Sequence, residues 1–103
     1  MAITRETAVD KIESMEDGCI QVRTATRLVE DGAVINTSYH RHWVEPSTKT
    51  GEETDLAGNI TKAGTWGDTD ISGEDARVQA IANATWTDSV KTAYQEMVDA
   101  QAL

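Results

Sequence analysis

The sequence has no phenylalanine, one cysteine and one proline, and only 9 basic residues against 18 acidic ones. Without phenylalanine, the large apolar side chains must come from three tryptophans, two tyrosines and the aliphatic residues. The single cysteine, Cys19, cannot form an intrachain disulfide, which favours synthesis in a reducing compartment. The net charge of −9 excludes a broad electrostatic interaction with nucleic acid and disfavours one with an anionic membrane surface.

Long apolar segments are missing as well. No apolar run approaches the roughly 20 residues that span a bilayer, and the start of the chain, residues 1–6, lacks the apolar region of a secretory signal. A length of 103 residues is typical of one domain with a small core. We therefore expect a single, soluble, acidic domain over residues 1–103.

Two Asp-Gly pairs, Asp17-Gly18 and Asp31-Gly32, organise the first half of the chain. An Asp-Gly pair between β-type segments favours a two-residue turn, because a type I′ turn needs positive φ at both central residues. The pairs therefore predict a three-stranded antiparallel meander over about residues 9–44. Its first strand is expected to be short, over about Val9–Met15.

The second hairpin also predicts a register, with Leu28 opposite Ile35 and Ile20 opposite Trp43. This register gathers six apolar side chains on one face of the sheet: Ile20, Val22, Leu28, Ile35, Tyr39 and Trp43. The other face is polar and receives Gln21, Arg23, Arg27, Asn36, Ser38, His40 and His42. Only Arg41 fits poorly on the apolar face, and its aliphatic stem is expected to reach the sheet edge.

The second half of the chain reads as a loop followed by helices. Residues 46–73 hold five glycines, six threonines and the only proline, a composition typical of a long loop. Ser72 and Asp75 then have the spacing of a capping box, and apolar residues recur at helical intervals to about residue 101. The expected fold class is α+β: a three-stranded antiparallel meander (about 9–44) packed against one or two C-terminal helices (about 73–101), with a long Gly/Thr-rich loop (45–72) between.

The His40-Arg41-His42 segment is the candidate metal site. Residues i and i+2 of a strand point to the same side, so both imidazoles project together. Two ligands leave a transition-metal site incomplete, so binding would require an oligomer that brings several copies to one axis. The alternative, which we favour, is a pair of exposed strand histidines with no metal or other cofactor.

Candidate partner-binding residues lie in the loop and on the hairpin. Trp66, in a glycine-rich segment, is either a plug folded onto the core or an anchor for a partner. Arg23 and Arg27, on the polar hairpin face, are the other candidates. No nucleophile elbow, phosphate loop or dinucleotide motif is present, and we expect no catalytic residues and no enzymatic activity.

Four segments are distinctive as strings: residues 2–7 (AITRET), 21–26 (QVRTAT), 39–42 (YHRH) and 72–81 (SGEDARVQAI). Together they resemble small, mostly uncharacterised proteins encoded in the structural gene region of marine and cyanobacterial tailed phages. The resemblance covers about residues 2–44 and 72–98, and the 46–71 loop is longer than expected for this group. The resemblance transfers no catalytic residue.

The resemblance implies a virion structural protein, made in the host cytoplasm and associated with the tail, baseplate or tail fibre. Its expected partners are other virion proteins, copies of itself, or both, and neither nucleic acid nor a membrane. Two alternatives stay open. One is a capsid decoration protein, and the other is a non-virion cytoplasmic binding module or assembly helper.

Overall fold

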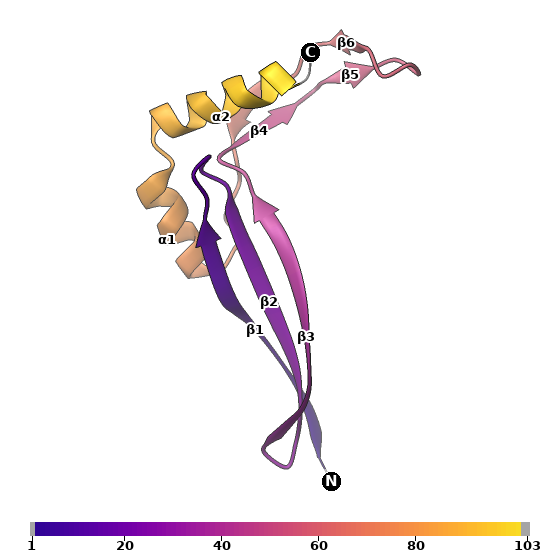
Figure 1. Cartoon of the computed structure of the whole chain (residues 1–103), viewed down its shortest axis with the longest axis vertical. Coiled ribbons are helices and arrows are strands. Elements are labelled where there is room, and N and C mark those ends of the chain that lie inside the picture. Colours follow the sequence, from indigo (N-terminus) through magenta and orange to yellow (C-terminus); the bar gives the residue numbers. More distant parts are fainter. Residues whose placement is uncertain (1, 102–103) are drawn as a thin grey trace.

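A computed structural model describes residues 2–101 and has an α+β fold (Figure 1). Three strands form an antiparallel sheet in the order β1-β2-β3, where β1 is Ile3–Ser14, β2 is Ile20–Glu30 and β3 is Ala33–Val44. Two helices follow near the C-terminus, α1 (Ala76–Thr85) and α2 (Asp88–Gln101). The predicted fold class, a three-stranded antiparallel sheet with one or two C-terminal helices, is confirmed, and the helices number two.

The sheet is much longer than the helix layer that covers it. Strand β1 begins at Ile3 and not near Val9, so the three strands continue as a ribbon beyond the helices (Figure 1). The molecule measures 58 × 36 × 21 Å, with a radius of gyration of 18.3 Å. A compact domain of this length has a radius of gyration of about 13 Å. The protein is therefore elongated.

The first hairpin has a wider connection than the Asp17-Gly18 pair predicts. Ser14 pairs with Ile20, and residues 15–19 form a loop closed by the amide of Met15, which donates to the carbonyl of Cys19 at 2.8 Å. Asp17 accepts a hydrogen bond from the Cys19 amide through its side chain. The predicted pairing of Met15 with Ile20 is therefore wrong, because the carboxylate of Asp17 stabilises a five-residue loop.

The second hairpin turns at Asp31-Gly32 as predicted, with positive φ at both residues (51° and 84°). Val29 pairs with Val34, but the next pair is Leu28 with Asn36, because Ile35 is an extra residue on β3. Beyond this β-bulge the register is shifted by one residue, which moves each β3 side chain to the other face.

The shift overturns the predicted assignment of faces. Ile20 and Val22 are buried as expected, but Ile35, Tyr39 and Trp43 are each more than half exposed. On β3, His42 instead shares the face of Val22. His40 and His42 therefore lie on the core face of the sheet, whereas Arg23 and Arg27, predicted on the same face as the histidines, lie on the opposite face.

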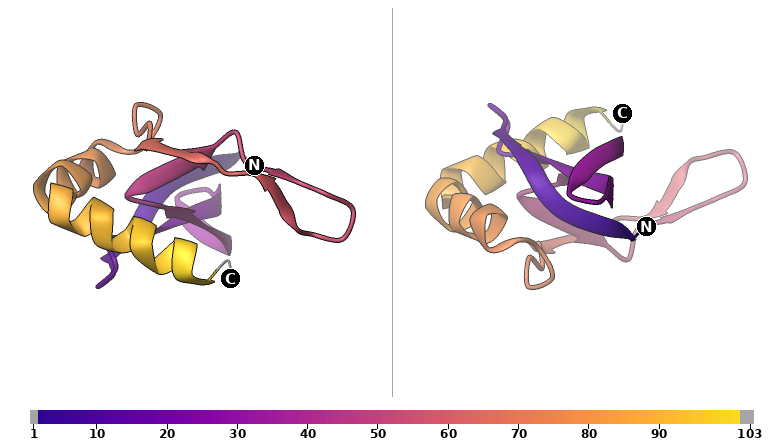
Figure 2. Two further views of the ribbon diagram at one scale, coloured as in Figure 1. Left: turned by 90° about the horizontal axis from the view of Figure 1, so that it is seen from above. Right: turned by 90° about the horizontal axis from the view of Figure 1, so that it is seen from below.

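The segment predicted as a loop contains two short antiparallel ladders. One joins β4 (Ser47–Thr50) to β7 (Thr65–Asp68), and the other joins β5 (Glu53–Thr54) to β6 (Ile60–Lys62). Together residues 47–68 form a long hairpin, called the arm below. Its base, β4 and β7, lies against α2, and its tip, β5 and β6, projects away from the sheet and the helices (Figure 2). Pairing of distant residues, such as Ser47 with Asp68, is not visible in local composition.

The core is small and lies between α1 and the end of the sheet that α1 covers. Ile20, Val22 and Val44 from the sheet pack against Val78 and Ala82 of α1. Five further apolar side chains surround this cluster at its margin: Val9, Ile12, Ile71, Ile81 and Trp86.

The helix starts differ slightly from the sequence prediction. The N-cap of α1 is Asp75 and not Ser72, because the carboxylate of Asp75 accepts from the amide of Arg77 at 2.8 Å. The first turn of α2 is capped by Thr87, whose hydroxyl accepts from the amide of Val90. The chain therefore forms two helices and not one bent helix.

Candidate interaction surface

The face of the sheet opposite the core is left open by the two helices. In the half of the sheet nearest the helices, this open sheet face is made by Lys11, Glu13, Gln21, Arg23, Ala25, Arg27, Tyr39, Arg41 and Trp43. Lys11, Arg23 and Arg41 lie directly opposite one another on the three strands. Like charges in such a row repel and need counter-charges.

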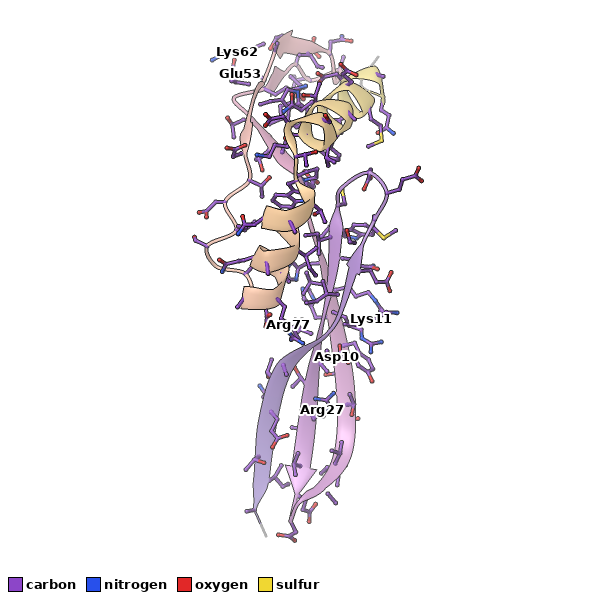
Figure 3. All side chains as sticks on the ribbon, turned by 90° about the vertical axis from the view of Figure 1, so that its left-hand side faces the viewer. Asp10, Lys11, Arg27, Glu53, Lys62 and Arg77 are labelled. Carbon is purple, nitrogen blue, oxygen red and sulfur yellow. The ribbon has the colours of Figure 1, made fainter. Side chains whose placement is uncertain are left out.

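Glu13 supplies the counter-charge of Lys11 at 2.7 Å, and Asp10, the extra residue of a second β-bulge between Val9 and Lys11, supplies that of Arg23. The carboxylate of Asp10 accepts two hydrogen bonds of 2.9 Å from Arg23, and it lies 3.9 Å from the Arg27 guanidinium. The Arg23 bonds, outweighing partial desolvation, hold the pKa of Asp10 below its usual value. Figure 3 shows Asp10, Lys11 and Arg27 together midway along the sheet.

Tyr39, Arg41 and Trp43 form an exposed stripe along β3, which is an edge strand. Tyr39 is 53% and Trp43 is 55% exposed. The Arg23 guanidinium lies 4.3 Å from the centroid of the Tyr39 ring, which fixes the ring by a cation–π contact. Arg41, between the two aromatic residues, is exposed and forms no ion pair within residues 2–101.

A groove of about 680 Å³ adjoins Trp43, between α2 and the loop of the first hairpin. Its apolar lining comes from Met15, Trp43, Val90, Ala93 and Met97, and its polar lining from Glu16, Asp17, Ser89 and Tyr94. The groove is therefore apolar inside and acidic where the loop borders it.

Two groups beside this groove keep their protons. Burial, with the carboxylate of Asp17 nearby, raises the pKa of the Cys19 thiol to about 12. Burial, with Glu45 nearby, also raises the pKa of the Tyr94 phenol. Cys19 is therefore a protonated, buried thiol without the character of a nucleophile.

Trp66 fastens the base of the arm to α2. Its ring meets Tyr94 edge-on with centroids 6.1 Å apart, and its indole N–H donates to the carboxylate of Asp99 at 3.2 Å. Lys49, on the paired strand, also bonds Asp99 at 3.0 Å. The indole of Trp66 is thus engaged within its own chain, against α2.

The tip of the arm, residues 51–63, is the most exposed part of the molecule. Leu56 is fully exposed and Ile60 is 44% exposed. The carboxylate of Asp55 accepts from the amides of Ala57 and Asn59, which orders the turn. These bonds, above all the one from Asn59, lower the pKa of Asp55 and keep it ionised.

The rings of His40 and His42 stack side by side, with centroids 6.5 Å apart, as their spacing predicts. His42 is also held by Glu74, with 2.7 Å between Nε2 and Oε1. Among residues 2–101, no group of three or more histidine, cysteine, aspartate or glutamate side chains is arranged to hold a metal ion. A metal at this pair would therefore need ligands from another molecule.

The structure brings Arg23 and Arg27 together on the open sheet face. It places Trp66, a residue of β7, elsewhere, in contact with α2. Sequence reasoning missed Arg41 and Leu56. Arg41 carried a signal, because it was the one residue that did not fit the predicted apolar face. Leu56 carried none, since a single leucine in a glycine-rich segment does not reveal its exposure.

Comparisons with protein-family models, with curated proteins and with solved structures found no match to this chain. Within residues 2–101, neither helix is long and apolar enough to cross a membrane.

Proposed function

We propose that this chain is a structural component of a phage virion, associated with the tail, baseplate or fibre, and that it works by protein–protein assembly. The observation that carries the proposal is its excess of exposed surface. The accessible area is 7002 Å² for a chain of 11.2 kDa. A compact monomer of that mass exposes about 5,700 Å².

The excess, about 1,300 Å², exceeds the roughly 800 Å² that each partner contributes to a standard protein–protein interface. Among residues 2–101, eight large apolar side chains are exposed, and they lie on the sheet, its loops and the arm: Ile3, Met15, Val34, Ile35, Tyr39, Trp43, Leu56 and Ile60. The exposed residues that adjoin one another are the informative ones, because contiguous apolar surface marks an interaction site: Met15 and Trp43 line one groove, and Tyr39 lies on the same sheet face as Trp43.

The virion is the proposed place of assembly because of the resemblance of residues 2–44 and 72–98 to tailed-phage proteins. An acidic chain with a net charge of −9 also stays apart from other copies until a specific contact forms. The partners in this proposal are other virion proteins and further copies of the chain.

Mass spectrometry of purified phage particles tests the proposal. We expect the chain at a fixed ratio to the other tail proteins, and in the tail fraction after the particles are dissociated. Recovery with empty capsids would point to a decoration protein instead. Absence from particles, with abundant chain in the infected cytoplasm, would overturn the proposal in favour of an assembly helper.

A further inference from the structure

We propose that the tip of the arm of one copy docks on the open sheet face of a second copy, with Leu56 against Tyr39 and Trp43 and with Glu53 beside Arg41. The inference rests on the proposed assembly role and names one of its contacts. Both surfaces are exposed in a single chain.

The receiving surface has the composition of an interaction hot spot. Tyr39, Arg41 and Trp43 stand at alternate positions of β3 and therefore on one face. Tyrosine, arginine and tryptophan are the residues most enriched where a few side chains carry most of the binding energy. Because Arg23 fixes the Tyr39 ring and β2 holds β3 in the sheet, these side chains lose little conformational entropy on binding.

The docking element is preorganised in a similar way. Asp55 orders the turn at the tip through its two amide contacts, and Leu56 stands out from that turn. The base of the arm is held to α2 by Asp99, which bonds both Lys49 and Trp66. The arm therefore presents an apolar side chain at a fixed distance from the body.

The charges of the two surfaces are complementary. The open sheet face and its border carry four bases (Lys11, Arg23, Arg27 and Arg41) and three acids (Glu6, Asp10 and Glu13). The tip of the arm carries three acids and one base: Glu52, Glu53, Asp55 and Lys62. Glu16 and Asp17 border the groove and repel the tip, which favours docking over Arg41 and not over α2.

Geometry requires a second copy. The β5–β6 hairpin projects away from its own sheet and helices, as the two end-on views show, and Glu53 and Lys62 lie far from Arg27 and Asp10 (Figures 2 and 3). Each contact joins different surfaces of the two copies, so it is either reciprocated in a two-fold dimer or repeated to give a closed ring or a filament.

The first test is sedimentation velocity of the full chain from micromolar to millimolar concentration. We expect association of the wild type, weakened about 30-fold or more by Leu56→Ser or by Arg41→Glu, the effect typical of removing a hot-spot residue. The matched controls are Ile3→Ser, at another exposed apolar residue, and Arg5→Glu, at an arginine on the other face of the sheet. Both controls should associate like the wild type.

A charge exchange provides the sharper test. Arg41→Glu alone and Glu53→Arg alone should each associate weakly, since each places like charges in contact. Their equimolar mixture should associate again, because each variant then meets an oppositely charged partner. Circular dichroism of each variant must match the wild type.

The inference is overturned if the wild-type chain stays monomeric, or if the mixture of the two charge variants associates no more strongly than each variant alone. A monomeric wild-type chain found nevertheless in purified particles would leave the proposed function standing and would assign the open sheet face to a different virion protein.

Discussion

Val22 of the central strand lies directly opposite His42 of β3. This pairing places a histidine on the core face and turns its neighbours, Arg41 and Trp43, toward the open side. It follows from one extra residue, Ile35, near the hairpin turn. A single bulge thus converts two aromatic residues that pattern alone would bury into an exposed stripe available to a partner.

This register predicts different stability effects for two large apolar residues. Ile20→Ala should lower the free energy of unfolding by about 2–5 kcal/mol, because Ile20 is fully buried in a small core. Tyr39→Ser should lower it by less than about 1 kcal/mol, since the ring is more than half exposed. Urea denaturation of both variants measures the difference. A loss at Tyr39 as large as that at Ile20 would contradict the register.

The Asp10–Arg23 pair predicts a pH dependence. The pKa of Asp10 is lowered in the folded chain from the ordinary value of 3.8, so its contribution to stability is complete above pH 3.8 and is lost as the pH falls through the lower, folded-state value. Asp10→Asn should therefore lower the melting temperature at neutral pH. The difference from the wild type should shrink in strong acid.

Glu6→Gln is the matched control for Asp10→Asn, because Glu6 lies on the same sheet face but forms no ion pair within residues 2–101. We expect its melting temperature to follow the wild type at both pH values. An Asp10→Asn deficit that is equal at neutral and acid pH would show that the ion pair is not its cause.

The anchor of the arm is also testable. Asp99→Ala removes the acceptor that Lys49 and Trp66 share, so amide hydrogen exchange should accelerate in β4 and β7 but not in the three-stranded sheet. Glu96→Ala, a nearby change on α2, should leave exchange in the arm unaltered. Unchanged exchange in Asp99→Ala would mean that the two-stranded ladder orders the arm without help from α2.

Cys19 should behave as a protected thiol. Its pKa of about 12 and its burial predict slow reaction with a maleimide at neutral pH, and a large acceleration when the chain is unfolded in urea. Mass spectrometry after timed quenching measures both rates. Equal rates in the folded and unfolded chain would contradict the burial of Cys19 at the end of the first hairpin loop.

The sequence predicts the elements that depend on local signals. The Asp31-Gly32 turn, the three strands and the two helices follow from turn chemistry and from hydrophobic periodicity. The bulges at Asp10 and Ile35 do not, because a bulge is stabilised by contacts between strands, such as the bonds from Arg23 to Asp10. Because the one extra residue Ile35 moves the β3 side chains to the opposite face of the sheet, the core residues were predicted less well than the order of the strands.

The interaction surface was harder to predict than the fold. The arm depends on pairing between residues 47–50 and 65–68 and on contacts with Asp99, which composition does not encode locally. Arg23 and Arg27 were found because they belong to β2, whose faces the bulge on β3 does not affect. Tyr39 and Trp43 were placed in the core because they are apolar.

Native mass spectrometry of the full, unmodified chain across a range of concentrations tests the assembly surface most directly. We expect species of two or more copies whose fraction grows with concentration, since the exposed area exceeds that of a compact monomer by about 1,300 Å². A chain that remains monomeric throughout would contradict self-assembly through the arm and the open sheet face.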